Sequence, residues 1–150
     1  MNKRHSVQVR IINKSSNPLP AYATSGASGM DIRADLPKAE TLIPLERRLV
    51  PTGLYMEIPA GFEVQIRPRS GLALKSGITC LNTPGTIDSD YRGELKVLLI
   101  NLSNEPQIIE PGDRIAQMVL TKSEQAELLL VQELNETQRA DGGFGHTGTR

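Results

Sequence analysis

Turn-forming residues recur about every ten residues along this chain and divide it into short apolar segments. This spacing is typical of a β-sandwich or β-barrel, in which short strands alternate with turns. The sequence contains no internal repeat and no long amphipathic helix pattern. We therefore predict an all-β fold.

The predicted strands either alternate apolar and polar residues or are short apolar runs bounded by Pro or Gly. They cover residues 7–11, 31–34, 41–43, 48–50, 54–58, 62–67, 94–101, 107–110, 115–120 and 128–132. The strand 94–101 is apolar on both faces, which predicts that it is covered on both sides. One short helix is expected over Ser70–Ser76, with Ser70 as its N-terminal cap and Gly77 at its end.

The chain has 150 residues, enough for one domain with an ordinary core. Its formal net charge is zero, so no overall field favours nucleic acid or an anionic membrane as a partner. We find neither a signal peptide nor a membrane-spanning apolar run, and we expect a cytoplasmic protein. The single cysteine, Cys80, lies in an apolar run, which predicts a buried and unreactive thiol.

The segment 83–93, TPGTIDSDYRG, concentrates charged groups in a predicted reversal of the chain. It begins with a Pro-Gly turn pair and ends in glycine. Between these lie the carboxylates of Asp88 and Asp90, then Tyr91 and Arg92. Taken alone, the segment fits a functional loop and an ordinary hairpin equally well.

Two further segments have compositions that suit phosphate binding. Residues 69–71, Arg-Ser-Gly, combine a guanidinium and a hydroxyl with a helix N-terminus, although a capped helix with a surface arginine is the alternative. Residues 135–150 are rich in glycine and hold one large apolar side chain, Phe144, so they cannot fold by themselves. They are either a disordered terminus or a loop whose backbone N–H groups bind an anion.

Residues 111–117, PGDRIAQ, form a predicted turn that leads into a strand. Here Asp113 and Arg114 are expected to form a structural ion pair. Gln117 lies among apolar neighbours, so it needs a hydrogen-bond partner if it is buried.

Five segments, taken together and in order, are similar to the motifs of the trimeric dUTPases. Five ordered matches in so short a chain are specific, whereas any one alone is not. The lead-in NTPG at residues 82–85 resembles the bacterial-type members. The matching segments are residues 25–31 (SGASGMD), 67–73 (RPRSGLA), 85–93 (GTIDSDYRG), 112–117 (GDRIAQ) and 139–148 (RADGGFGHTG).

The resemblance implies a jelly-roll-like β-barrel over residues 1–134 and a Gly-rich C-terminal arm over residues 135–150. It implies a homotrimer in which each active site takes its first, second and fourth motifs from one chain and its third from a neighbour. The arm of the remaining chain closes over that site. The implied reaction is hydrolysis of dUTP to dUMP and pyrophosphate with Mg²⁺, which limits uracil in DNA and supplies dUMP for thymidylate synthesis.

The same resemblance implies the roles of individual residues. Asp88 matches the general base that activates water for attack at the α-phosphorus. Tyr91 would lie against the deoxyribose and exclude a 2′-hydroxyl. Asp31 would contact Mg²⁺ through water, in keeping with a cation that retains its waters. Asp90 and Arg92 are expected to be structural.

The remaining site residues fall into three implied groups. The uracil would be read by Asn82, by the backbone of Thr86 and Ile87, and by Lys96, in a hairpin too narrow for a 5-methyl group. Phosphates near the scissile bond would contact Arg69, Ser70, Gly71 and Gln117. The terminal phosphate would be held by Arg139, Gly145, His146 and Thr147, with Phe144 stacked on the uracil.

Two residues of the C-terminal arm depart from the motif that is usual in the family. Asp141 adds a negative charge to the arm, and His146 stands where Ser is common. Both departures bear on how tightly the arm binds the phosphates, and neither involves the proposed base.

Other functions on the same fold are the alternatives. A sister group of deaminases shares the fold, but the position of its catalytic Glu is occupied here by Leu98, which cannot transfer protons. A non-catalytic nucleotide-binding protein would not need Asp88. A lectin or capsid-like jelly roll would explain neither the Arg-Ser-Gly segment nor the Gly-rich arm.

Overall fold

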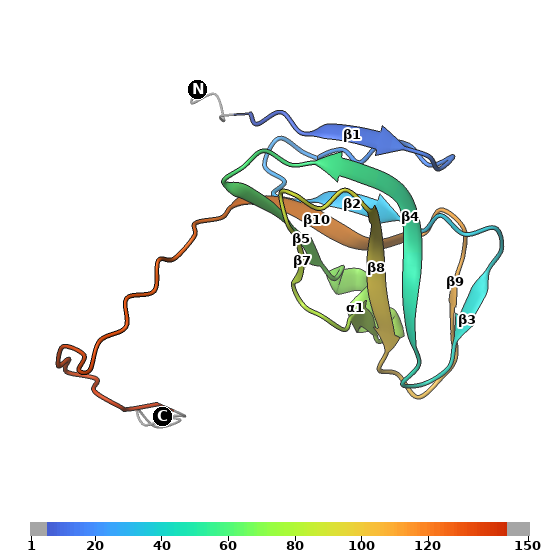
Figure 1. The fold of residues 1–150 in the computed structure, drawn as a ribbon. Coiled ribbons are helices and arrows are strands. Elements are labelled where there is room, and N and C mark those ends of the chain that lie inside the picture. The colour runs from blue at the N-terminus through green and yellow to red at the C-terminus, as the bar shows by residue number, and fades with distance from the viewer. Residues whose placement is uncertain (1–5, 144–150) are drawn as a thin grey trace.

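A computed structural model describes residues 6–143 of the chain (Figure 1). It contains strands and one short helix, and the predicted all-β fold is confirmed. The elements are β1 (Arg10–Asn13), β2 (Met30–Arg33), β3 (Glu40–Leu42), β4 (Arg47–Glu57), β5 (Phe62–Arg67), α1 (Ser70–Ser76), β6 (Ile78–Cys80), β7 (Gly85–Ile87), β8 (Glu94–Asn101), β9 (Gln107–Ile109) and β10 (Arg114–Lys122).

The strands form two four-stranded antiparallel sheets and one small pair. The order is β1-β4-β8-β6 in the first sheet and β2-β10-β5-β7 in the second, while β3 pairs with β9. Strands distant in sequence are therefore neighbours, as in a jelly-roll-like barrel. Among residues 6–143, no helix is long and apolar enough to cross a bilayer.

One hydrophobic core lies between the two four-stranded sheets. Val97 and Leu99 of the first sheet belong to the same buried cluster as Ile32 and Met118 of the second. The strand β8 alternates buried residues with Lys96, which is exposed, and with half-buried positions. The prediction that this strand is covered on both faces is therefore correct only in part, because its outer face remains partly open.

Several predicted elements need correction. Residues 48–50 and 54–57 belong to one strand, β4, whose pairing with β8 is interrupted between Pro51 and Leu54, and the predicted Ile58 lies just beyond its end. The helix α1 does run over Ser70–Ser76 and ends at Gly77, but its N-cap is Arg69 and no side chain caps it. Ser70 is thus the first helical residue instead of the cap, because the extended conformation belongs to Arg69.

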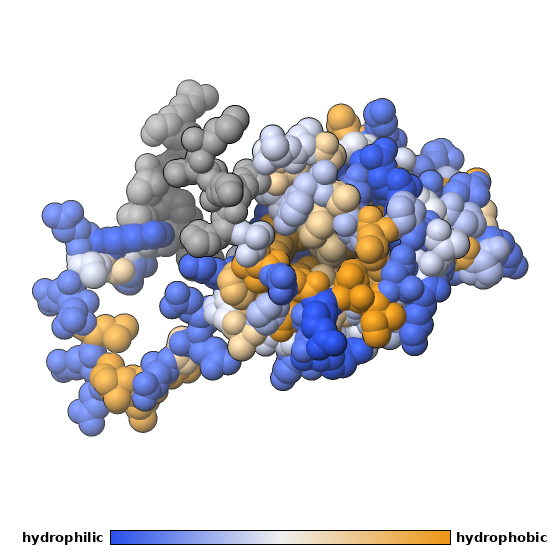
Figure 2. Space-filling model, turned by 90° about the horizontal axis from the view of Figure 1, so that it is seen from above, coloured by the Kyte–Doolittle hydropathy of each residue, from blue (hydrophilic) through white to orange (hydrophobic). Residues whose placement is uncertain are grey.

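The predicted strand over residues 128–132 is wrong. After β10, the backbone N–H of Ser123 donates to Gly61 O, and the chain then runs away from the barrel without regular structure (Figure 1). Leu128, Leu129 and Leu130 are 92%, 82% and 97% exposed. Figure 2 shows hydrophobic residues on this segment outside the barrel. A strand needs a pairing partner, and the chain's own sheets offer none there.

Candidate active site

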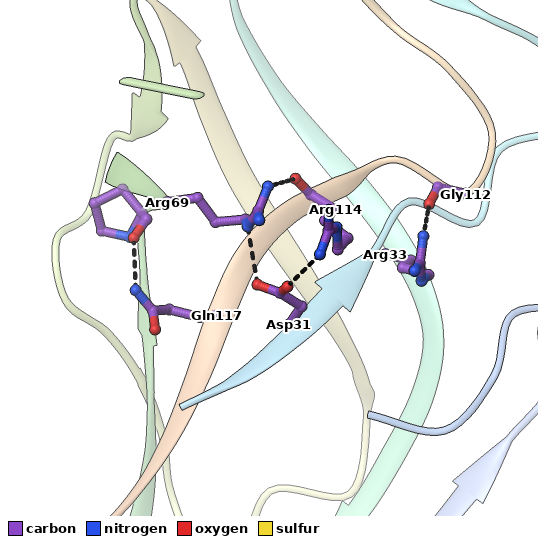
Figure 3. Close-up of polar contacts among 7 residues, drawn as sticks. Asp31, Arg33, Arg69, Gly112, Arg114 and Gln117 are labelled. Atoms are coloured by element: carbon purple, nitrogen blue, oxygen red, sulfur yellow. Dashed lines mark hydrogen bonds and ion pairs between the residues drawn. The ribbon is translucent and has the colours of Figure 1, made fainter. Parts of the chain in front are cut away.

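A cluster of polar side chains brings together three of the recognised sequence motifs (Figure 3). The Asp31 carboxylate of β2 accepts hydrogen bonds from Arg69 Nε at 2.9 Å and from Arg114 Nη1 at 3.3 Å. Arg69 Nη1 also donates to Arg114 O at 3.3 Å. Gln117 Nε2 donates to the carbonyl of Pro68 at 3.1 Å. We call Asp31, Arg69, Arg114 and Gln117 the phosphate cluster, after the phosphate contacts that the resemblance implies for Arg69 and Gln117.

The register of the second sheet explains why these residues meet. Strand β10 lies between β2 and β5, and Gln117 is opposite Asp31 on one side and Arg67 on the other. A Cβ on Gly29 would lie 2.6 Å from Gln117 Oε1, so glycine allows the amide to approach. The predicted need of Gln117 for a hydrogen-bond partner is confirmed.

The predicted ion pair between Asp113 and Arg114 is wrong. Asp113 Oδ2 instead accepts the backbone N–H of Glu110 at 2.9 Å. A register shift follows Arg114 in the pairing with β2, and the guanidinium lies against Asp31. Such an irregularity redirects side chains locally, and no residue pattern in the sequence marks it.

The N-terminus of α1 adjoins the phosphate cluster. Ser70 and Gly71 are both exposed, and the N–H of Ala73 donates to Arg69 O at the start of the helix. The earlier N–H groups of a helix have no intrahelical acceptor, so they are available to an anion. A hollow of about 230 Å³ lies here, lined by Arg69, Leu72, Ile109, Asp113, Arg114 and Ile115.

The segment 83–93, for which we keep the name hairpin, contains β7, connects it to β8 and presents its functional groups outward. Its two arms do not pair with each other as expected, because β7 pairs with β5 while β8 pairs with β4 and β6 in the other sheet. The Asp88 carboxylate is exposed beside a hollow of about 650 Å³, whose walls include Phe62 and Glu63 at the start of β5. The N–H of Tyr91 donates to Asp88 O at 3.2 Å. Arg92 Nη1 donates to two carbonyls of the hairpin, at 2.7 and 3.0 Å. These bonds agree with the expected structural role of Arg92.

Tyr91 folds back along the hairpin toward the first residue of β8. Its hydroxyl donates to Glu94 O at 3.0 Å, and the side chain remains 46% exposed. Glu94 Oε1 accepts the backbone N–H of Gly53 at 2.9 Å, while Lys96 Nζ lies 3.6 Å from Glu94 Oε2. Glu94 therefore links Tyr91 and Lys96 to strand β4.

The predicted uracil-reading residues lie at the edge of the second sheet. Strand β7, which contains Thr86 and Ile87, is its outermost strand. Asn82 and Thr86 are exposed, and Ile87 is half-buried. An edge strand presents backbone donors and acceptors that the sheet does not use, which suits recognition of a base edge.

Asp88 and the phosphate cluster do not come together within one chain. Asp31 lies opposite Gln117, which is opposite Arg67, whereas Ile87 is opposite Val64, so Asp88 lies near the other end of β5. The two carboxylates are separated by three strand spacings. Strand spacing of about 4.8 Å and a rise of about 3.3 Å per residue then place their backbones on the order of 20 Å apart along the sheet.

The arm residues are placed only in part. Arg139 lies in a turn, where its Nε donates to Gly142 O at 2.8 Å, and within residues 6–143 it has no hydrogen bond or ion pair with the phosphate cluster or the hairpin. The predicted roles of Phe144, Gly145, His146 and Thr147 concern residues outside the described part of the chain.

The donor atoms of the site limit how a metal ion could be held. Within residues 6–143, no group of three or more His, Cys, Asp or Glu side chains is arranged around a metal position. The Asp31 carboxylate accepts one arginine N–H on each oxygen, and each oxygen has a second lone pair. One carboxylate with spare lone pairs fits a cation held mainly by phosphates and waters.

Two residues of the site region were not identified from sequence. Arg114 was assigned to a local pair, and Glu94 was not distinguished from other strand residues. Cys80 behaves as predicted: it is buried, and this burial raises the pKa of its thiol to about 11.

Comparison with known proteins supports the resemblance to the dUTPases that the sequence motifs indicate. The dUTPase family model matches residues 15–148. The chain is 61% identical to the deoxyuridine 5'-triphosphate nucleotidohydrolase of Finegoldia magna, over 95% of this chain and 99% of that protein. It is 60% identical to the corresponding protein of Fusobacterium nucleatum, over 95% and 97%.

Among solved structures, a variant of the Staphylococcus bacteriophage 80alpha dUTPase with dUpNHpp matches with a TM-score of 0.84. The match covers 95% of this chain and 99% of that one at 24% identity, so it supports the fold alone. The family model spans most of the sequence, and it includes the hairpin and every member of the phosphate cluster. The chain belongs to the dUTPase family.

Proposed function

We propose that this chain hydrolyses dUTP to dUMP and pyrophosphate as a homotrimer, with water attacking the α-phosphorus. The observation that carries the proposal is the phosphate cluster, in which Asp31 holds Arg69 beside the open N-terminus of α1. A guanidinium and free backbone N–H groups both favour phosphate oxygens. Arg69, Ser70, Gly71 and Gln117 are therefore assigned to the phosphates next to the scissile bond.

Asp88 is assigned as the general base. A carboxylate in this role must lie within about 3 Å of the water that it deprotonates. Asp88 is exposed beside a hollow, so a substrate and its water can reach it. The Asp88 carboxylate takes the proton while the water oxygen bonds to the α-phosphorus, and the bond to the pyrophosphate oxygen breaks.

The separation between Asp88 and the phosphate cluster supports a site shared between chains. A base whose backbone lies on the order of 20 Å from Asp31 of its own chain, at the other end of β5 from the phosphate cluster, is too far to act on a phosphorus bound at that cluster. A neighbouring chain can supply the hairpin, as expected for the trimeric members of the family. Closed cyclic symmetry then gives each chain the same role in three equivalent sites.

We assign the C-terminal arm to the active site of a neighbouring chain, because the leucines that lead into it are exposed. Leu134 is 87% exposed, like the leucines of residues 128–130, and so much apolar surface favours burial against another protein surface. Residues 135–150 would then close over a neighbour's site, where Arg139 and residues 145–147 hold the terminal phosphate and Phe144 covers the uracil.

Specificity is assigned to the hairpin. The outer edge of β7 would pair with the uracil, aided by Asn82 and Lys96, and Tyr91 would occupy the space of a ribose 2′-hydroxyl. The sister deaminase reaction is not favoured. Leu98 of β8, which lies half-buried opposite Leu49 of β4, has no group that can transfer a proton.

Mg²⁺ is the proposed cofactor, contacted by Asp31 through water. When bound, it would neutralise charge that develops on the leaving pyrophosphate. The carboxylate of Asp31 keeps lone pairs for such waters while it orients Arg69 and Arg114. In the cell we expect the enzyme in the cytoplasm, where it limits uracil in DNA and supplies dUMP for thymidylate synthesis.

Pyrophosphate release measured with dUTP, UTP, dTTP and dCTP tests this function. We expect rapid release from dUTP and little from the other three. Ammonia released from dCTP would support the deaminase instead. Binding of dUTP without any turnover would support a non-catalytic nucleotide-binding protein.

A further inference from the structure

We propose that Gly93 determines the discrimination between deoxyribose and ribose, because it provides the space in which the Tyr91 ring lies. The inference rests on the proposed function, from which it takes the placement of Tyr91 against the sugar. It assigns a specificity role to a residue that would touch no part of the nucleotide.

The packing of the two residues is unusually close. A Cβ at position 93 would lie 2.3 Å from Tyr91 Oη, 2.5 Å from Cζ and 2.9 Å from Cε2. Real Cβ atoms essentially never approach other heavy atoms within 3.0 Å. The ring edge therefore occupies the volume that any other side chain at position 93 would need.

Space, and not backbone conformation, is the reason for glycine here. The glycines of the described chain that have positive φ are Gly53, Gly61, Gly77 and Gly112. Gly93 is not among them, so alanine fits its backbone conformation. The substitution Gly93→Ala would therefore act mainly through the contact with Tyr91.

The position of the ring depends on few other restraints. Its hydroxyl donates to Glu94 O at 3.0 Å, and nearly half of the side chain is exposed. Glu94 is itself held by the N–H of Gly53 in β4. The Tyr91 ring thus lies between the carbonyl of Glu94 and the backbone of Gly93. A Cβ at position 93 would push the ring away from that backbone.

Such a displacement is compatible with folding. The atoms that would clash lie at the far end of one partly exposed side chain, which can rotate into solvent. Tyr91 does not belong to the buried core cluster, which includes Leu95, Val97 and Leu99 of β8. We therefore expect Gly93→Ala to fold as a normal trimer with an altered sugar site.

A double-mutant cycle tests the proposal with full-length protein. The measured quantity is the ratio of kcat/KM for dUTP to kcat/KM for UTP in the wild type, Gly93→Ala, Tyr91→Ala and the double variant. We expect Gly93→Ala to lower this ratio about tenfold or more, since steric discrimination against one small group has this size. Because Gly93 acts through the ring, adding Gly93→Ala to Tyr91→Ala should change nothing further.

Two matched variants serve as controls. Tyr91→Phe keeps the ring against Gly93 and should retain most of the discrimination. Ser16→Ala changes an exposed side chain in a loop outside all five motifs, so the ratio should equal that of the wild type.

The outcomes separate this inference from the function on which it rests. A wild-type ratio in Tyr91→Ala would contradict the proposed sugar role of Tyr91. Loss of discrimination in Tyr91→Ala with a wild-type ratio in Gly93→Ala would overturn the role of Gly93 alone. If circular dichroism shows Gly93→Ala to be unfolded, the double variant decides: a folded protein with the Tyr91→Ala ratio supports the proposal, and an unfolded one overturns it.

Discussion

The hairpin 83–93 and the phosphate cluster are built in opposite ways. Within the hairpin, hydrogen bonds join residues one to three positions apart, such as Arg92 to Ser89 O and Tyr91 to Glu94 O. In the phosphate cluster, Asp31 binds Arg69, 38 positions away, and Arg114, 83 positions away. The part of the hairpin that follows β7, residues 88–93, is therefore held by local bonds, whereas the cluster exists only when the second sheet has formed.

This difference suggests a division of labour. The cluster holds charges that are already oriented by one another, which suits binding of a polyanion. The hairpin carries Asp88 with its carboxylate exposed, which suits chemistry on a substrate that another surface has positioned. Substitutions in the hairpin should thus reduce turnover, and substitutions in the cluster should weaken binding.

The largest expected effect is that of Asp88→Asn. The amide cannot accept the proton of the attacking water, so kcat should fall by at least about a hundredfold. Calorimetry with dUpNHpp should show nearly unchanged binding, because the phosphate cluster is intact. The matched control is Asp90→Asn, which should retain most of the activity. Near-normal turnover of Asp88→Asn would refute the assignment of the base.

Removal of residues 139–150 should have the next largest effect. The deletion leaves every strand intact, so ultracentrifugation should still detect a trimer. Turnover should fall by about tenfold or more, because the phosphates lose contacts that position them. An active truncated trimer would mean that the arm is only a chain terminus.

Arg114→Gln should produce a smaller change that is confined to binding. Asp31 would lose one of its two arginine partners, and this partner is half exposed, so the expected rise in KM is about fivefold with kcat nearly constant. Arg33→Gln is the matched control, because Arg33 bonds to Gly112 O and not to Asp31 (Figure 3). Equal effects of the two substitutions would remove Arg114 from the cluster.

Glu46→Gln should leave both regions unchanged and affect only stability in acid. A hydrogen bond from Arg48, at 2.5 Å, lowers the pKa of Glu46 below its usual value of 4.5. The stability from this pair is therefore present above pH 4.5 and is lost as the pH falls through the lower pKa of the folded protein. Urea unfolding should show a small deficit of the variant at neutral pH that vanishes in acid. A deficit that persists in acid would contradict this origin.

The same contrast explains which features the sequence predicted. The strand 62–67, the strand 94–101 and the helix Ser70–Ser76 have the observed bounds, because their periodicity and end signals are local. Asp88 and Tyr91 were selected because their whole motif lies in one turn. The strands β6 and β7 were missed as strands, since three residues are too few to establish a period.

Features that depend on distant partners were predicted poorly. Arg114 has an acidic neighbour in sequence, but the register shift in β10 brings it to Asp31. Residues 128–132 have the apolar pattern of a strand, and they pair with no strand among residues 6–143. Periodicity identifies a segment that can pair, and it does not identify the chain that supplies the partner.

Mixing a hairpin variant with a phosphate-cluster variant, both assayed at a dUTP concentration at which neither alone is appreciably active, most directly tests the central claim that each site combines the hairpin of one chain with the phosphate cluster of another. Asp88→Asn and Arg69→Ala chains, carrying different tags, would be co-expressed in equal amounts and their mixed trimers purified. A site is intact when its cluster comes from an Asp88→Asn chain and its hairpin from an Arg69→Ala chain. Each mixed trimer has one such site among its three, so about a third of the wild-type rate should return. No recovery in mixed trimers would contradict the shared site.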